Sequence, residues 1–225
     1  MDGKTRLLLN MLVKGIFGFA LIGLPLFACA GTLDYVNAWM LIASLFVLIM
    51  TMGFVLLFKY PQTLEKRLKS RESERAQRSS IAVMGVLFLA SFVLAGLDHR
   101  FGWTRISLTG SVIALIILFF GYGMFAAVIL QNSYASRVVE IQENQVVIST
   151  GLYAAVRHPM YLACLLVFLP MPIILGSFIA LIPMLVFPVA LVRRIRNEES
   201  VLASGLPGYA EYMKKTKYRL IPYIW

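Results

Sequence analysis

Residues 160–192 read MYLACLLVFLPMPIILGSFIALIPMLVFPVALV and contain no charged side chain. A helix crosses the hydrocarbon core of a bilayer with roughly 20 apolar residues, so this stretch is too long for a single span. Pro170, Pro172 and Gly176 interrupt it near its middle, and residues of these types end helices. We therefore predict two shorter membrane helices joined as a tight hairpin, with kinks in the second at Pro183 and Pro188.

Four further apolar segments precede this hairpin, at about 11–30, 38–58, 80–97 and 107–130. We expect helices because an exposed strand edge leaves backbone groups unpaired in lipid. The first segment follows basic residues as a signal peptide does, but we interpret it as a membrane helix. The predicted fold is all-α: a polytopic bundle of about six transmembrane helices with a cytoplasmic C-terminal cap. Residues 1–130 would supply four helices and a basic loop at 59–79, and residues 131–225 the functional core.

The composition agrees with a membrane protein. Of the 225 residues, 60% are hydrophobic and 14% charged, whereas soluble domains carry about a quarter charged residues. The net charge of +10 comes from basic residues beside the apolar segments, where anionic lipid headgroups lie, so we expect no nucleic-acid partner. Cys29 and Cys164 lie inside apolar runs, which argues against a disulfide framework or a cysteine-rich metal site. We expect no metal.

The distribution of Lys and Arg predicts the orientation in the membrane. With the six predicted spans, 19 of the 21 basic residues fall on one side, and only Arg100 and Arg105 fall on the other. An excess of positive charge marks the cytoplasmic side. Both termini are therefore predicted to be cytoplasmic. The loop at 59–79 alternates in sign and is typical of a solvated helical extension along the headgroups.

Polar residues gather in the last third of the chain. Residues 138–149 alternate in polarity around the pair Glu143-Asn144, which favours a hairpin or an extended loop at the membrane surface. The segment TGLYAAVRHPMY follows at 150–161. Because Pro159 suits the first turn of a helix, Arg157 and His158 should lie at a helix N-terminus, where an anion is favoured.

A second polar group, RRIRNEES at 193–200, follows the last apolar segment. Arg194 and Glu198 are four residues apart and share a helical face, so they either pair or both point into a common pocket. Glu199 points elsewhere and is expected to be structural. Tyr209 and Tyr212 lie three apart on one face of a further helix. The hairpin should bring the two polar groups together.

These motifs resemble the isoprenylcysteine carboxyl methyltransferase family, a group that also includes membrane phospholipid N-methyltransferases. The resemblance covers about 131–222 and rests on GLYAAVRHPMY, the apolar hairpin, RNEESVL and GYAEYMKKTKYRLIP, in this order. It implies an S-adenosylmethionine-dependent membrane methyltransferase in which Arg194 serves the substrate carboxylate. The implied cofactor contacts are Val146, Val147, Ile148, Tyr153, His158, Pro159, Met160, Tyr161 and Glu198.

The chain departs from the eukaryotic enzymes of this family in two respects. Gln145 stands where they have a histidine, after a shorter polar segment, so a contact of Glu140 or Gln142 with the cofactor stays open. Those enzymes also have more spans than are predicted here. A prenylated-protein substrate is therefore less firmly implied than the methyl transfer itself.

The residue types suit this chemistry. A pocket for S-adenosylmethionine needs aromatic walls, an acid for hydroxyls or the amine, and donors for the carboxylate. We take Arg194, His158 and Arg157 as candidate catalytic residues. A carboxylate acceptor needs no general base, whereas an amine acceptor must lose a proton, for which His158 or a glutamate is the candidate. Carboxylate, amine and thiol acceptors all stay open. The acceptor is expected to be lipophilic and to arrive sideways from the bilayer.

Two other functions fit part of the pattern. An NADPH-dependent sterol-type reductase would share a related C-terminal architecture, but its additional cysteine-lysine-tyrosine segment is absent from this sequence. A transporter or a non-catalytic scaffold is the other alternative. Transporters place ionisable groups near the midplane of the membrane, whereas the spans predicted here are almost free of charge.

Overall fold

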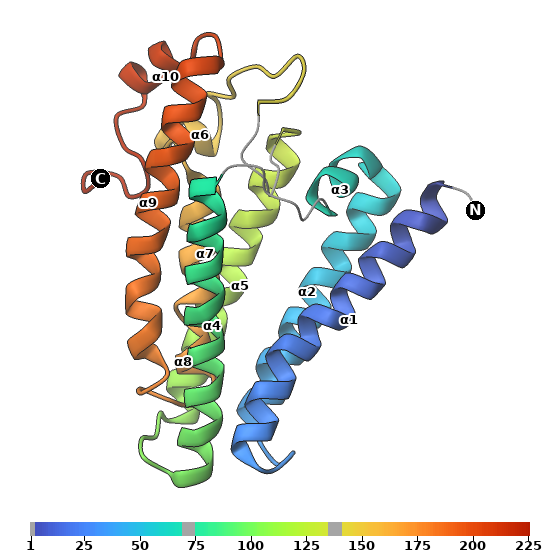
Figure 1. Ribbon diagram of the computed structural model, residues 1–225, viewed down its shortest axis with the longest axis vertical. Helices are drawn as coiled ribbons and strands as arrows, with labels where there is room; N and C mark the ends of the chain where they lie inside the picture. The colour runs from blue at the N-terminus through green and yellow to red at the C-terminus, as the bar shows by residue number, and fades with distance from the viewer. Residues whose placement is uncertain (1–2, 69–74, 135–140) are drawn as a thin grey trace.

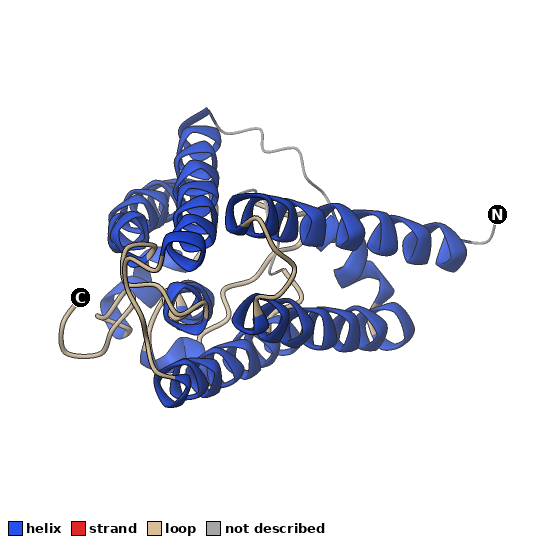
Figure 2. Cartoon of the chain, turned by 90° about the horizontal axis from the view of Figure 1, so that it is seen from below, coloured by secondary structure: helices blue, strands red, loops and turns tan. Residues whose placement is uncertain are grey.

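The computed structural model describes residues 3–68, 75–134 and 141–225, and this part of the chain consists of helices and loops without strands (Figures 1 and 2). Four helices are long and apolar enough to cross a membrane. They are α1 (Gly3–Ala30), α2 (Val36–Lys59), α4 (Arg75–Phe101) and α5 (Leu108–Gln131). The predicted all-α fold is thus confirmed, and the chain is an integral membrane protein.

The apolar stretch that follows doubles back on itself, as predicted. It forms α7 (Pro159–Phe168), the short α8 (Met171–Ile174) and, after a turn, α9 (Leu181–Gly205). Leu165 of α7 packs in one cluster with Phe187 and Leu191 of α9. Helix α9 continues past the apolar residues, so its last turns carry the polar group. The total number of membrane crossings stays a prediction.

The two prolines of α9 occupy different positions. Pro183 lies in the first turn, where the missing N–H would have no acceptor within the helix, so no hydrogen bond is lost there. Pro188 lies inside the helix. A kink at Pro188 stays a prediction, and Pro183 has no reason to cause one.

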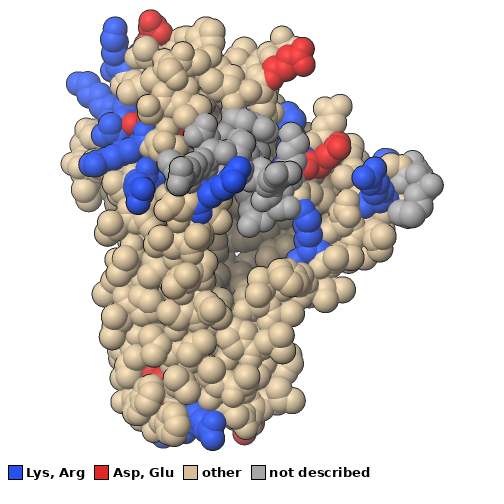
Figure 3. All heavy atoms as spheres, in the orientation of Figure 1, with Lys and Arg blue, Asp and Glu red and all other residues tan. Residues whose placement is uncertain are grey.

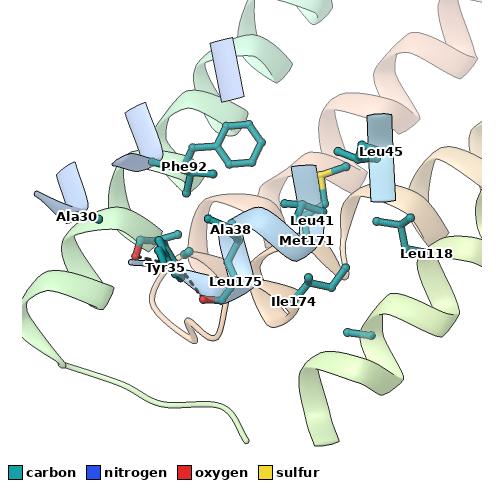
Figure 4. Packing of buried hydrophobic residues seen from close by; sticks show 14 of the residues in the cluster. Ala30, Tyr35, Ala38, Leu41, Leu45, Phe92, Leu118, Met171, Ile174 and Leu175 are labelled. Carbon is teal, nitrogen blue, oxygen red and sulfur yellow. Dashed lines mark hydrogen bonds between the residues drawn. The ribbon is translucent and has the colours of Figure 1, made fainter. Parts of the chain in front are cut away.

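Two close helix contacts hold the bundle together. A Cβ atom at Gly121 of α5 would lie 2.6 Å from the Cβ of Leu166 in α7, and one at Gly96 of α4 would lie 2.5 Å from the carbonyl oxygen of Leu26 in α1. Both glycines therefore let neighbouring backbones approach closely, as small residues do in membrane bundles. The buried cluster of Figure 4 joins α1, α2, α4, α5 and α8.

At the end of the molecule opposite α10, polar groups fasten the loops. Asp98 is 1% exposed. It accepts hydrogen bonds from the backbone N–H of Thr104 at 2.7 Å and from the hydroxyls of Thr104 and Ser177. His99 stacks on Tyr35 with 3.9 Å between ring centroids. The sequence is most simply interpreted as placing Asp98 and His99 among loop polar groups, but both lie in the last turn of α4. These hydrogen bonds stabilise the Asp98 carboxylate in the interior.

Lys and Arg gather at the end of the molecule that carries α10 (Tyr209–Lys215) and α6 (Leu152–Ala155), and few lie at the other end (Figure 3). Within the predicted basic loop at 59–79, residues 61–68 form the helix α3 (Pro61–Leu68), and residues 75–79 already belong to α4. Residues 69–74 and 135–140, and with them Glu140, lie outside the described residues. The asymmetry of charge agrees with the predicted cytoplasmic side.

Candidate active site

A pocket opens at the basic end of the bundle, between the loop before α6, the start of α7, the end of α9 and the cap helix α10. The eleven residues that the sequence assigns to the site all line it: Val146, Val147, Ile148, Tyr153, Arg157, His158, Pro159, Met160, Tyr161, Arg194 and Glu198. Segments about forty residues apart therefore meet in one pocket. Their meeting depends on the hairpin of α7 and α9.

The local backbone sets the direction of the first segment. His158 is the N-cap of α7, and Pro159 is its first residue, as predicted. The backbone N–H groups of Arg157 and His158 donate to the carbonyls of Tyr218 and Arg219, at 2.9 and 2.8 Å. The C-terminal tail is thereby fixed beside the start of α7.

A buried carboxylate connects the three segments. Glu199, which is 5% exposed, lies 2.6 Å from Arg157 Nε, 3.3 Å from His158 Nε2 and 2.7 Å from Arg219 Nε. Burial raises the pKa of Glu199, but the hydrogen bonds from His158, Arg219 and Arg157 outweigh it and hold that pKa at about 2. Glu199 is therefore ionised at neutral pH. Its position agrees with the structural role expected for it.

Inside the pocket, a chain of hydrogen bonds joins α9 to α7. Arg194 Nε donates to Tyr161 Oη at 3.0 Å, and the Tyr161 hydroxyl donates to Glu198 Oε2. The sequence left open whether Arg194 and Glu198 pair or share a pocket. Both line the pocket, and the Tyr161 hydroxyl lies between them.

Arg157 uses its donors differently. Besides Glu199, its guanidinium donates through Nη1 to the carbonyl oxygens of Thr216 at 2.9 Å and Lys217 at 3.2 Å. Arg157 as a whole residue is 6% exposed. Arg157 therefore lines the pocket while its hydrogen bonds hold the segment after α10.

Tyrosines form much of the wall. Asn132 donates to the Tyr153 hydroxyl at 2.8 Å, and the Tyr212 hydroxyl donates to the carbonyl of Tyr153 at 2.7 Å. Burial raises the pKa of both phenols to about 12, so they stay protonated at neutral pH. Tyr209 also lines the pocket, and its hydroxyl is buried. Within the described part of the chain this buried group has no hydrogen-bond partner, and a bound ligand could satisfy it.

Sequence reasoning gave no site role to several lining residues. Leu202 follows Glu198 by one helical turn, and this spacing could have predicted its place in the pocket. No feature of the local sequence indicates that Asn132, Tyr134 and Leu206 line the pocket. Gln145 also lines the pocket. Gln142 is absent from the lining, and its side-chain amide donates to the carbonyl of Tyr134 at 2.8 Å.

Part of the sequence is similar to known proteins. Residues 112–204 match the model of the isoprenylcysteine carboxyl methyltransferase (ICMT) family. The chain is 27% identical over 129 residues to the cobalt-zinc-cadmium resistance protein CzcN of Cupriavidus metallidurans. That match spans 57% of this chain and 58% of the relative.

The fold resembles that of a solved structure. The eukaryotic intramembrane Ras methyltransferase ICMT superposes with a TM-score of 0.54 and 18% identity, over 100% of this chain and 99% of that one. At this identity the likeness concerns the fold. The family match, however, covers every site residue from Val146 to Glu198. Together, these comparisons show that residues 112–204 are similar to the ICMT family and that the fold resembles that of the solved Ras methyltransferase.

Proposed function

We propose that this protein transfers a methyl group from S-adenosylmethionine to the carboxylate of a lipophilic, isoprenylcysteine-like acceptor. The observation that carries the proposal is the Arg194–Tyr161–Glu198 chain of hydrogen bonds. It lies in the same pocket as all nine predicted cofactor contacts. The family match supports methyl transfer as the reaction.

The residues present fit the cofactor. The Glu198 carboxylate can accept hydrogen bonds from the ribose hydroxyls or the amine of the cofactor. The buried Tyr209 hydroxyl has no hydrogen-bond partner among the described residues. Tyr153 and Tyr212 supply aromatic surface, and Val146–Ile148 provide an edge of backbone and apolar side chains. When bound, S-adenosylmethionine supplies a methyl group activated by the adjacent sulfonium.

The residues of the chain then position the acceptor. Arg194 would hold the acceptor carboxylate by charge-assisted hydrogen bonds. Its link to Tyr161 fixes the guanidinium relative to Glu198, and so relative to the cofactor side of the pocket. Because the carboxylate is already ionised, no proton has to be removed, and catalysis depends on alignment and charge placement.

The role of His158 depends on whether the acceptor is a carboxylate or an amine. An amine acceptor requires a base, for which the sequence offered His158 or a glutamate. Its Nε2 lies 3.3 Å from Glu199, and the side chain is buried. We assign His158 and Arg157 to holding the cap rather than to proton transfer. Methylation of a lipid amine is the alternative.

We further propose that both termini lie in the cytoplasm and that the chain crosses the membrane six times. Lys and Arg gather at the end of the molecule that carries α10 (Figure 3), and residues of α10 line the pocket, so a water-soluble cofactor would enter from the cytoplasm. The acceptor would come from the bilayer. Labelling of single cysteines introduced near each terminus, in sealed and in opened vesicles, tests this orientation.

The experiment that tests the function uses purified protein in lipid nanodiscs. We expect titration calorimetry to detect binding of S-adenosylhomocysteine to the protein. With labelled S-adenosylmethionine, we expect the protein to methylate N-acetyl-S-farnesylcysteine but not phosphatidylethanolamine. Glu198→Gln should lose cofactor binding, and Glu65→Gln, an exposed acid on α3, should retain it. Absence of cofactor binding to the wild type would refute the proposal, and methylation of the lipid amine alone would favour the alternative.

A further inference from the structure

A second cavity of about 410 Å³ lies between α1, α2, α3, α5 and α7. The space-filling view shows the molecule hollowed between the α1–α2 arm and the rest of the bundle (Figure 3). Its lining is mainly apolar, with Phe19, Met52 and Phe125 among the larger side chains. The volume is within the range of small-molecule sites, roughly 300–1,000 Å³. We call this cavity the apolar groove.

The groove and the active-site pocket follow one another along the same two helices. On α7, Met160 lines the pocket, and Cys164, four residues later, lines the groove. On the α5 side, Ile129 lines the groove, and Asn132, just past the end of the helix, lines the pocket. Residues three or four apart lie on one helical face. A molecule in the groove would therefore have one end directed toward the pocket.

The charges of the groove lie at this end. Its lining, taken over the described residues, contains Lys14 and Arg67 but no acidic side chain. Lys14 Nζ donates to the carbonyl of Leu68 and so holds α3 across the groove. The Arg67 guanidinium lies 4.9 Å from the ring centroid of Phe125, as in a cation–π contact. The charged end of the groove is thus positive.

The helix that carries Arg67 also lies beside the active-site pocket. Lys66, the neighbour of Arg67 on α3, has its Nζ 5.5 Å from the ring centroid of Tyr134. Tyr134 lines the active-site pocket. Helix α3 therefore contacts a wall of the pocket while Arg67 lines the groove.

We propose that Arg67 is a second, specificity-determining cation for the acceptor, placed across from Arg194 where the apolar groove meets the active-site pocket. The acceptor is then a lipid with a single acidic group, whose hydrocarbon chain lies in the groove and whose carboxylate lies between the two guanidiniums. This inference rests on the proposed function. In the reaction, a carboxylate oxygen bonds to the methyl carbon as the bond from carbon to sulfur breaks. An ester and a neutral thioether result, and no proton moves.

The charge part of the proposal is tested by binding. N-acetyl-S-farnesylcysteine and its primary amide differ only in the ionised group, and their affinities are measured for protein in nanodiscs saturated with S-adenosylhomocysteine. We expect the wild type to bind the acid more tightly, and Arg67→Met to reduce this preference roughly tenfold or more, the worth of one charged hydrogen bond. Arg67→Lys should restore part of it. Lys59→Met removes an exposed cation at the end of α2 and should change nothing.

The groove itself is tested by filling it. Gly18 lines the groove, and a Cβ atom there meets nothing within 4 Å, so Gly18→Leu should fold and weaken binding of the acid and the amide alike. Gly123 on α5 has equal space around it and lines neither cavity. Gly123→Leu is therefore the matched control, with affinities expected to equal those of the wild type.

The outcomes separate the two proposals. If the wild type binds no S-adenosylhomocysteine, the proposed function fails. A different failure is possible when cofactor binding is intact. If Arg67→Met lowers the affinities for the acid and the amide equally, or changes neither affinity, Arg67 does not distinguish the charged ligand from the neutral one. If Gly18→Leu binds both ligands as the wild type does, the chain of the acceptor lies elsewhere.

Discussion

Replacing Glu199 by Gln should destabilise the cap of the active site without removing any group that faces the pocket. Glu199 is the common partner of Arg157, His158 and Arg219. Glutamine keeps nearly the same shape but has no charge, and its amide offers one acceptor oxygen in place of two. Arg157 and Arg219 would then lie close together without their shared anion.

The structure gives the size of the effect. The side chains of Arg157 and Glu199 are only 5% and 6% exposed, and removal of one partner from a buried ion pair costs about 3–5 kcal/mol. The side chain of Arg219 is 34% exposed. Because water screens the Arg219–Glu199 ion pair, we assign it no contribution to the free energy of unfolding. By the scaling for chains of 150–250 residues, this loss corresponds to a fall in Tm of roughly 6–20 °C.

The measurement is thermal unfolding of the purified protein in detergent, with S-adenosylhomocysteine affinity determined well below the melting temperature. Glu198→Gln is the matched control: it has the same chemistry at the adjacent position, where the side chain faces the pocket. We expect that control to lose cofactor affinity with little change in Tm. Equal Tm values for the two variants would refute the division of roles between the two glutamates.

Three further outcomes are expected. Folding lowers the pKa of Glu199 from 4.5 to about 2. The stability that ionised Glu199 gives the fold is therefore complete above about pH 4.5 and is lost as the pH falls toward 2. The Tm of the wild type should decrease between these pH values, and the Tm of Glu199→Gln should not. Gly121→Ala should cost about 1–3 kcal/mol by forcing α5 away from Leu166, while Gly123→Ala, measured by the same melts, should be neutral. Tyr161→Phe removes the hydroxyl between Arg194 and Glu198 and should raise the KM for the acid acceptor in the methylation assay without lowering Tm.

The hairpin was predictable because its signals are local. An uncharged stretch too long for one span, broken by Pro170, Pro172 and Gly176, leaves few arrangements other than two antiparallel segments. Once the chain doubles back, Arg157 and His158 must lie near Glu198. The resemblance to a known family then selected the pocket residues, and all of them line one cavity.

The features that the sequence did not predict depend on partners far away in the chain. Asp98 reads as a loop residue until Thr104 and Ser177 are seen to donate to it. Arg157 reads as a donor for a ligand until Glu199 and the carbonyls near Thr216 take up its guanidinium. The apolar groove depends on the placement of the α1–α2 arm against α5 and α7, for which no motif exists. Periodicity shows which face of a helix is apolar, but it does not show how far that face lies from its neighbour.

Adjacent residues on α9 explain why binding and stability are separable in this site. Successive side chains on a helix differ by about 100° in direction, so Glu198 can face the pocket while Glu199 faces the ion cluster. The cluster fixes the tail through Arg219, and Arg157 holds the carbonyls after α10. The ion cluster thus acts on the tyrosines of the cap indirectly, through the tail and the segment after α10. A substitution in the cluster should therefore weaken ligand binding only as far as it loosens the cap, whereas one at Glu198 should weaken binding directly.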